Sequence, residues 1–225
     1  MFPSLDPVGR RPAGSAVLLA LLACFPVATL LPRAWGWENG VLETVQVLVL
    51  LAGAMLALAA WWRQRPSPMA LLALCAVPFW IVLAAREMSW GAVLGVPLAF
   101  TENGPLFSSK TLWYKPFVAS AVGLLLGCTL LRLWTARLDL LLRRLVHEGR
   151  IPWLLLALAV LGEMGSSCAE GRLGCTQVAA FPFAMVFEEL TELVAYVALV
   201  AAQARVLLRP AAVDKPVLAP AESLS

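Results

Sequence analysis

The sequence predicts an all-α, polytopic integral membrane protein, a bundle of about six transmembrane helices with both termini in the cytoplasm. Hydrophobic residues make up 61% of the 225 residues and charged residues only 14%, against about 25% in soluble domains. A soluble protein of this size could not bury so much apolar surface and still present a polar exterior. The apolar residues also gather into long runs, which short charged segments separate.

A spanning helix needs about 20 mostly apolar residues. Six runs of the chain meet or approach this length: 14–31, 41–62, 69–94, 116–134, 151–165 and 181–208. Residues 1–13 precede them as a cytoplasmic tail, and residues 209–225 follow as a cytoplasmic tail without ordered structure. Together the runs define one transmembrane domain over residues 14–208.

The first run begins at Gly14 and is closed by Pro32. Arg10 and Arg11 precede it, as in a signal peptide or a twin-arginine export signal, and Cys24 stands where a lipoprotein signal could be cleaved. However, the residues after Cys24 stay apolar, whereas a mature lipoprotein would turn polar. We therefore expect an uncleaved first helix.

The other runs differ in how much charge they carry. The second holds Glu43 near its start, and the fourth begins with Pro116, a residue suited to the first helical turn. The third, fifth and sixth are interrupted by charged residues, so their ends are harder to place. Between the third and fourth runs, residues 102–105 (Glu-Asn-Gly-Pro) predict a turn.

The distribution of Lys and Arg orients the spans, because cytoplasmic loops are enriched in them. Four regions are rich in basic residues and fall on one side of a six-span chain: Arg10 and Arg11; Arg63 and Arg65; Arg132, Arg137, Arg143, Arg144 and Arg150; Arg205, Arg209 and Lys215. The remaining loops are poorer: Arg33; Lys110 and Lys115; Arg172. This pattern is typical of a bacterial inner-membrane protein. Arginines of the cytoplasmic loops are explained by topology and anionic lipid, not by nucleic acid.

Cys168 and Cys175 flank a Gly-rich stretch in the loop predicted to lie outside the cell. An oxidising exterior favours a disulfide between them. Two free thiols are the alternative. A zinc site lacks partners, because the one histidine, His147, falls in a cytoplasmic loop.

Ionisable residues inside the membrane are costly and are often functional. The sequence predicts seven of them in the outer half of the bundle: Glu43, Arg86, Glu87, Glu163, Glu188, Glu189 and Glu192. Glu188 and Glu192 share one helix face, and Glu43 shares a face with Gln46. These polar faces cannot contact lipid cheaply, so we expect them to converge on an interior cavity that opens to the outside.

Six carboxylates cannot all remain ionised around one guanidinium group. Either several are protonated, or a cation is bound: a metal, a transported proton or a cationic headgroup. An all-oxygen site suits a divalent Mg²⁺, Ca²⁺ or Mn²⁺ ion, for which Glu163, Glu188 and Glu192 are the candidate ligands. The chain lacks the motifs for a nucleotide and the intramembrane histidines for a haem. Alternatively, Arg86 pairs with a glutamate and simply holds two helices together.

Three functions remain open. The first is a transporter or channel that binds or translocates a proton or cation at the carboxylates. The second is a membrane enzyme that acts on a lipid or lipid-linked substrate at the outer leaflet, with Glu188 or Glu192 as general base or metal ligand and Arg86 on a phosphate. The third is a subunit or assembly factor whose buried charges pair with other membrane subunits. All three place the site on the periplasmic or extracellular side.

Overall fold

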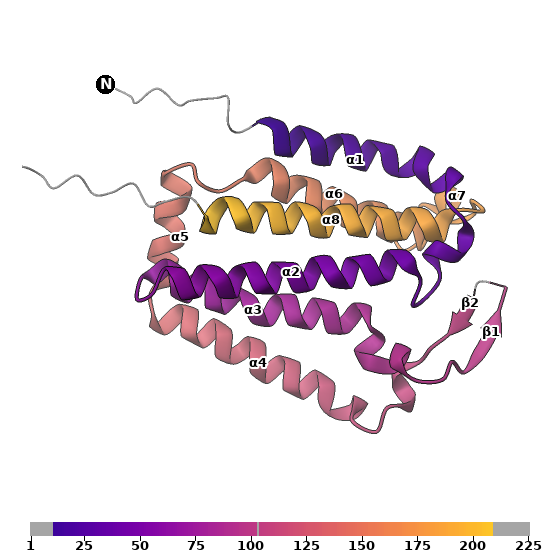
Figure 1. The fold of residues 1–225 in the computed structure, drawn as a ribbon, viewed down its shortest axis with the longest axis horizontal. Coiled ribbons are helices and arrows are strands. Elements are labelled where there is room, and N and C mark those ends of the chain that lie inside the picture. The colour runs from indigo at the N-terminus through magenta and orange to yellow at the C-terminus, as the bar shows by residue number, and fades with distance from the viewer. Residues whose placement is uncertain (1–10, 103, 209–225) are drawn as a thin grey trace, which may run out of the picture.

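The computed structural model describes residues 11–102 and 104–208. Its long helices lie side by side along one direction, and α5 crosses them at one end (Figure 1). The helices are α1 Arg11–Leu30, α2 Val41–Arg63, α3 Pro68–Glu87, α4 Lys115–Thr135, α5 Leu138–His147, α6 Trp153–Ala169, α7 Thr176–Ala179 and α8 Ala184–Leu207. The connections hold the 3-10 turns η1 Arg33–Gly36, η2 Ser89–Leu94 and η3 Ser109–Thr111, and a hairpin of β1 Ala99–Thr101 and β2 Gly104–Leu106.

Within the described residues, four helices are long and apolar enough to cross a membrane: α1, α2, α3 and α4. Helix α6 is equally apolar but has 17 residues, and α8 has 24 residues but carries three glutamates near its start. Large apolar side chains point outward on several of these helices, as with Leu22, Met55 and Leu124, each at least 65% exposed. This surface suits lipid rather than water. The predicted tails at residues 1–10 and 209–225 lie outside the described residues.

Helix α8 lies at the centre of the bundle and packs against α1, α2 and α6. Small residues allow this close packing: Ala195 and Ala198 of α8 are fully buried. Helix α2 also packs along α3, where Leu50, Trp80 and Tyr196 form one apolar cluster. Helix α4 contacts α3 on the outer side of that pair. The elements that carry the glutamates are therefore neighbours around α8.

Helix α3 ends at Glu87, earlier than the end near Leu94 that the sequence predicts. The reason is a backbone turn into the left-handed region, with φ of 59° at Trp90 and 93° at Gly91. An α-helix cannot continue through such residues. The following segment forms η2, which folds back over the end of the bundle.

The arginine-rich segment before α6, predicted as a loop, contains helix α5. Its buried side chains, Leu138 and Leu145, are seven residues apart and share one face. Arg143 and Arg144 are exposed. Helix α5 is thus amphipathic, and it covers the ends of the longer helices at what is called the α5 end below (Figure 1).

The opposite end, called the hairpin end, is closed by short elements. In the hairpin, Thr101 pairs with Gly104, which confirms the predicted turn, although Asn103 itself lies outside the described residues. Gly104 has a φ of 101°, and a Cβ atom there would collide with the ring of Trp37. Glu38 connects η2 to the segment after β2, since it accepts hydrogen bonds from the Ser89 hydroxyl at 3.0 Å and the Phe107 backbone amide at 2.9 Å.

A disulfide bond joins Cys168 and Cys175, as the sequence predicts. It closes the turn between α6 and α7 at the hairpin end. Cys24, Cys75 and Cys128 are free thiols in the described part of the chain.

Candidate functional site

Arg86, Glu87 and Glu192 form an ion-paired group between α3 and α8. The guanidinium Nε lies 3.3 Å from Glu87 Oε1, and an Nη2 atom lies 3.7 Å from Glu192 Oε1. The two carboxylates are largely buried, with side chains 8% and 12% exposed, whereas the Arg86 side chain is 53% exposed. One guanidinium thus serves two buried carboxylates and still presents free N–H groups to its surroundings.

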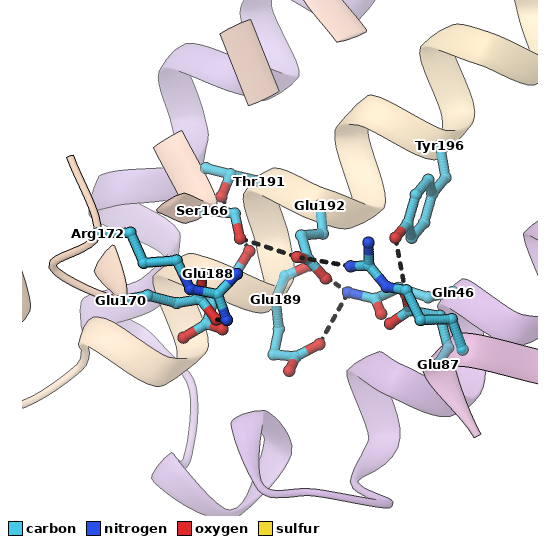
Figure 2. Close-up of polar contacts among 11 residues, drawn as sticks. Gln46, Glu87, Ser166, Glu170, Arg172, Glu188, Glu189, Thr191, Glu192 and Tyr196 are labelled. Atoms are coloured by element: carbon cyan, nitrogen blue, oxygen red, sulfur yellow. Dashed lines mark hydrogen bonds and ion pairs between the residues drawn. The ribbon is translucent and has the colours of Figure 1, made fainter. Parts of the chain in front are cut away.

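Two hydroxyl groups complete this group, and neither was predicted from the sequence. The buried Tyr196 hydroxyl donates a 2.8 Å hydrogen bond to Glu87 Oε1, and Ser166 Oγ donates one of 2.8 Å to Glu192 Oε1 (Figure 2). Helical spacing could have revealed them. Tyr196 follows Glu192 by four residues, and Ser166 follows Glu163 by three, so each shares a helix face with a predicted glutamate.

Glu189 and Gln46 form a second group, between α8 and α2. Gln46 is fully buried and its Nε2 atom donates to both Glu189 Oε2 and the Glu189 carbonyl oxygen, each at 2.8 Å. Its amide oxygen, Oε1, is also buried and has no hydrogen-bond donor among the described residues. A buried acceptor without a donor is costly and therefore uncommon. Gln46 thus pairs with Glu189 across the helix contact, and not with Glu43 on its own helix.

Glu43 lies in the first turn of α2, where it accepts a hydrogen bond from the backbone amide of Asn39. Together with Glu87 it lines a small cavity of about 120 Å³ at the hairpin end. Val93 and Leu94 of η2 form another wall of this cavity. The turn that follows α3, which the sequence predicts as the end of the third span, therefore covers Glu43 and Glu87.

Glu163 and Glu188 stand apart from these hydrogen-bonded pairs. Glu163, on α6, interacts electrostatically with Arg86 and Glu87 but makes no hydrogen bond or direct ion pair in the described part of the chain. Glu188 lies beside Glu170 and Arg172 of the turn after α6 (Figure 2). Those two residues pair with each other at 2.6 Å.

The contact between α6 and α8 is unusually close and brings Glu163 toward Glu192. A Cβ atom at Gly162 would lie 2.7 Å from the Thr191 carbonyl oxygen and 2.9 Å from Ala195 Cβ. Thr191 is buried in this contact, and its hydroxyl donates to the carbonyl groups of Phe187 and Glu188. Glycine at position 162 therefore sets how near the two acid-bearing helices can approach.

The proposed metal ligands Glu163, Glu188 and Glu192 are not gathered into one ligand set. Within residues 11–102 and 104–208, no three His, Cys, Asp or Glu side chains form a group that could hold a metal ion. The physical reason is the direction of each side chain. Glu188 turns toward Arg172, Glu192 is held by Arg86 and Ser166, and Glu163 lies on the facing helix.

The site as a whole carries an excess of acid. The halves of α2, α3, α6 and α8 toward the hairpin end hold Glu43, Glu87, Glu163, Glu188, Glu189 and Glu192, with Arg86 as their single Lys or Arg residue. Buried carboxylates without counter-charge bind a proton or a cation. The arrangement is therefore suited to holding positive charge.

No protein-family model, no curated protein and no solved structure gives a significant match to this chain.

Proposed function

We propose that this protein is a six-span inner-membrane protein that binds a proton or a small monovalent cation in its acid-rich half. The observation that carries the proposal is the buried pair of Gln46 and Glu189. The Gln46 amide oxygen has no donor among the described residues, and the Glu189 carboxylate has no basic partner there. Amide and carboxylate oxygens are ligands of the kind that hard cations prefer.

Charge supports this reading of the pair. Glu189 interacts electrostatically with Glu43, Glu188 and Glu192, all of them acids. Arg86 lies against Glu87 and Glu192 instead. A positive charge at Glu189 would relieve this repulsion, and it would also satisfy the Gln46 oxygen.

The proposed topology follows the basic residues. Helix α5 carries Arg143 and Arg144 at the end where Arg63 and Arg205 also lie, so this end is proposed to face the cytoplasm. The disulfide lies at the other end, which fits an oxidising exterior. With α6 and α8 counted as spans, six helices cross the membrane. The acid-rich half then opens toward the periplasm.

Binding is better supported than passage through the bundle. Between the acids and the α5 end, the Gln203 amide oxygen accepts from Trp80 Nε1 at 2.5 Å, and its Nε2 donates to the Gly53 carbonyl at 2.8 Å. This contact joins α2, α3 and α8, and the halves of α2, α3, α6 and α8 toward the α5 end hold no Asp or Glu residue to pass an ion onward. The proposed activity is therefore cation or proton binding from the outer side.

The test measures thermal unfolding of the protein in lipid nanodiscs, with sodium, potassium or a bulky organic cation at constant ionic strength. A bound cation stabilises the folded state by about 2.7 kcal/mol at one hundred times its Kd. We expect one small cation to raise the Tm and the bulky one to have no effect. Infrared spectra recorded over a pH range would detect a proton instead, as a carboxylic acid band.

The informative variant is Glu189→Gln, since its amide oxygen can still accept the hydrogen bond from Gln46 while the charge is lost. It should abolish both the cation-dependent rise in Tm and the carboxylic acid band. Glu170→Gln is the matched control, because Glu170 is already paired with Arg172 near the surface. The proposal fails if neither signal is present in the unmodified protein, or if Glu189→Gln leaves both unchanged.

A further inference from the structure

An apolar groove of about 390 Å³ lies between α3, α6 and α8, on the side toward the α5 end. Its walls include Phe79 and Leu83 of α3, Leu156 of α6 and Leu199 of α8, and Leu145 of α5 contributes at its end. A volume of several hundred Å³ is the size of sites that hold small ligands. The groove is thus a cavity of ligand size within the part of the chain that we propose to span the membrane.

The same three helix faces become charged toward the hairpin end. Arg86 follows Phe79 by seven residues, Glu163 follows Leu156 by seven, and Glu192 precedes Leu199 by seven. Seven residues are almost two full helical turns, so each pair shares a face and is separated by about 10 Å along the helix.

Arg86 also pairs with Glu192 and interacts electrostatically with Glu163, so the three residues face one another. The groove lining is the apolar end of the proposed site, and these three residues, which lie outside that lining toward the hairpin end, are its charged end.

In a bilayer, an apolar groove between helices is not left empty. The groove offers water only one polar side chain, Gln203, and an unfilled groove would lose the contacts of its lining. The surrounding membrane supplies acyl chains. A lipid chain is the occupant that matches the apolar end.

The charged end selects the headgroup. The Arg86 side chain is 53% exposed and retains N–H groups beyond its two ion pairs, which suits a phosphate. Glu163 makes no hydrogen bond or direct ion pair among the described residues, which suits an ammonium group. A quaternary ammonium cannot donate hydrogen bonds to a carboxylate, and an anionic headgroup would meet repulsion from Glu163 and Glu192.

We propose that this groove binds one phospholipid with a primary ammonium headgroup, of the phosphatidylethanolamine class. One acyl chain lies along Phe79, Leu156 and Leu199, the phosphate contacts Arg86 and the ammonium contacts Glu163. The proposal rests on the proposed function in one respect, since the ammonium is a positive charge bound by the same carboxylate-rich half. It differs in position, because the lipid uses Glu163 and not the Gln46–Glu189 pair.

The experiment is native mass spectrometry of the full chain released from vesicles that contain equal amounts of phosphatidylethanolamine, phosphatidylglycerol and phosphatidylcholine. We expect one retained phosphatidylethanolamine, preferred about tenfold or more over the other two lipids. Glu163→Gln should remove the preference among headgroups and leave one lipid bound. Leu156→Trp and Leu83→Trp, which fill the groove, should each abolish retention.

Leu124→Trp is the control, because Leu124 is 70% exposed on α4, away from the groove. It should retain lipid as the unmodified protein does. Equal retention of all three lipids would overturn the headgroup assignment. Lipid retention by both groove-filling variants would show that the lipid does not bind in the groove. A co-purified polypeptide in place of lipid, lost on Arg86→Gln, would show a partner subunit instead.

The two proposals can fail separately. Leu156→Trp should lose the lipid and keep the cation-dependent rise in Tm, whereas Glu189→Gln should lose the rise in Tm and keep the lipid. If the unmodified protein shows neither a cation effect nor a carboxylic acid band but retains phosphatidylethanolamine, the proton or cation site at Glu189 is wrong and the lipid site stands.

Discussion

The Tyr196 hydroxyl donates a 2.8 Å hydrogen bond to Glu87 Oε1 across the contact between α8 and α3. Both side chains are buried, at 1% and 8% exposure. A hydrogen bond to a buried carboxylate is among the stronger kinds, because one of its two groups is charged. Glu87 also pairs with Arg86, and Arg86 pairs in turn with Glu192. The tyrosine bond therefore fixes the position of one of the two acids that Arg86 contacts.

Tyr196→Phe should therefore destabilise the protein by about 2 kcal/mol, the usual cost of losing a hydrogen bond to a charged group. The ring keeps its place in the apolar cluster with Leu50 and Trp80. Unfolding in nanodiscs or mixed micelles measures the change. Val197→Ala is the neighbouring control, since Val197 is 41% exposed and outside the network. Equal stability of Tyr196→Phe and the unmodified protein would show that the bond contributes nothing.

The disulfide between Cys168 and Cys175 should stabilise the folded protein, because it closes a short loop in the unfolded chain. For a sequence separation of 7, loop-closure entropy gives about 2 kcal/mol. Cys168→Ser should lower the free energy of unfolding by that amount, and addition of a reductant should do the same to the unmodified protein.

Counting thiols checks the bond itself. The chain has 5 cysteines, and Cys24, Cys75 and Cys128 are free. In protein isolated from the membrane and denatured without reductant, a maleimide polymer should add to those free thiols alone, and after reduction to all five. Full labelling without reductant would place this loop in a reducing compartment, against the proposed topology.

Much of the fold could be predicted from sequence, because apolar runs and charged loops are local signals. The end of α3, however, could not be predicted in this way. Residues 69–94 are apolar enough to suggest a longer helix, but Trp90 and Gly91 adopt left-handed backbone angles that hydropathy does not reveal. Helix α5 was missed for a related reason: its arginines were explained by topology, although Leu138 and Leu145 already had helical spacing.

The acids of the site could be listed from sequence, but their partners could not. Glu188, Glu189 and Glu192 lie within five residues of one another, yet their surroundings differ. Glu189 pairs with Gln46 and Glu192 with Arg86, whereas Glu188 lies near the Glu170–Arg172 pair. The surroundings of each glutamate depend on which helices lie around α8 and how closely they pack. Neither property is encoded in the spacing of one helix.

At the α5 end, Glu148 offers a pH-dependent contact outside the candidate spans. A hydrogen bond of 2.6 Å from Arg144 Nε lowers the pKa of Glu148, and the nearby charges of Arg144 and Arg150 act in the same direction. Its ionised form therefore stabilises the end of α5 at pH values above the ordinary glutamate pKa of about 4.3. This stabilisation is lost as the pH falls through the lowered pKa of the folded state.

Arg144→Gln should raise the pKa of Glu148 toward its ordinary value. Carbon NMR of labelled glutamate carboxyl groups would follow the titration, with Glu148→Gln identifying the resonance. The difference in the Glu148 pKa between the variant and the unmodified protein should shrink at high salt, because the Arg144–Glu148 pair is exposed to solvent. An identical titration in the Arg144→Gln variant would show that the hydrogen bond does not form.

The glycine contact between α6 and α8 gives the sharpest structural test. Gly162→Ala would place a Cβ atom 2.7 Å from the Thr191 carbonyl oxygen, so one helix must move. Overpacking of this kind costs about 1–3 kcal/mol. At Gly165 the nearest atom is the Thr191 methyl carbon at 3.3 Å, and Gly165→Ala should be milder. At Gly123 nothing lies within 4 Å, so Gly123→Ala should not destabilise.

The same displacement should reach the site. Moving α6 away from α8 lengthens the 2.8 Å bond between Ser166 and Glu192 and draws Glu163 away from Arg86. Gly162→Ala should therefore weaken the preference for phosphatidylethanolamine over the other two lipids, while the Gln46–Glu189 pair, formed between α2 and α8, keeps its cation-dependent rise in Tm. If Gly162→Ala were as stable as Gly123→Ala and kept the same headgroup preference, the close approach of α6 to α8 would not be what positions Glu163.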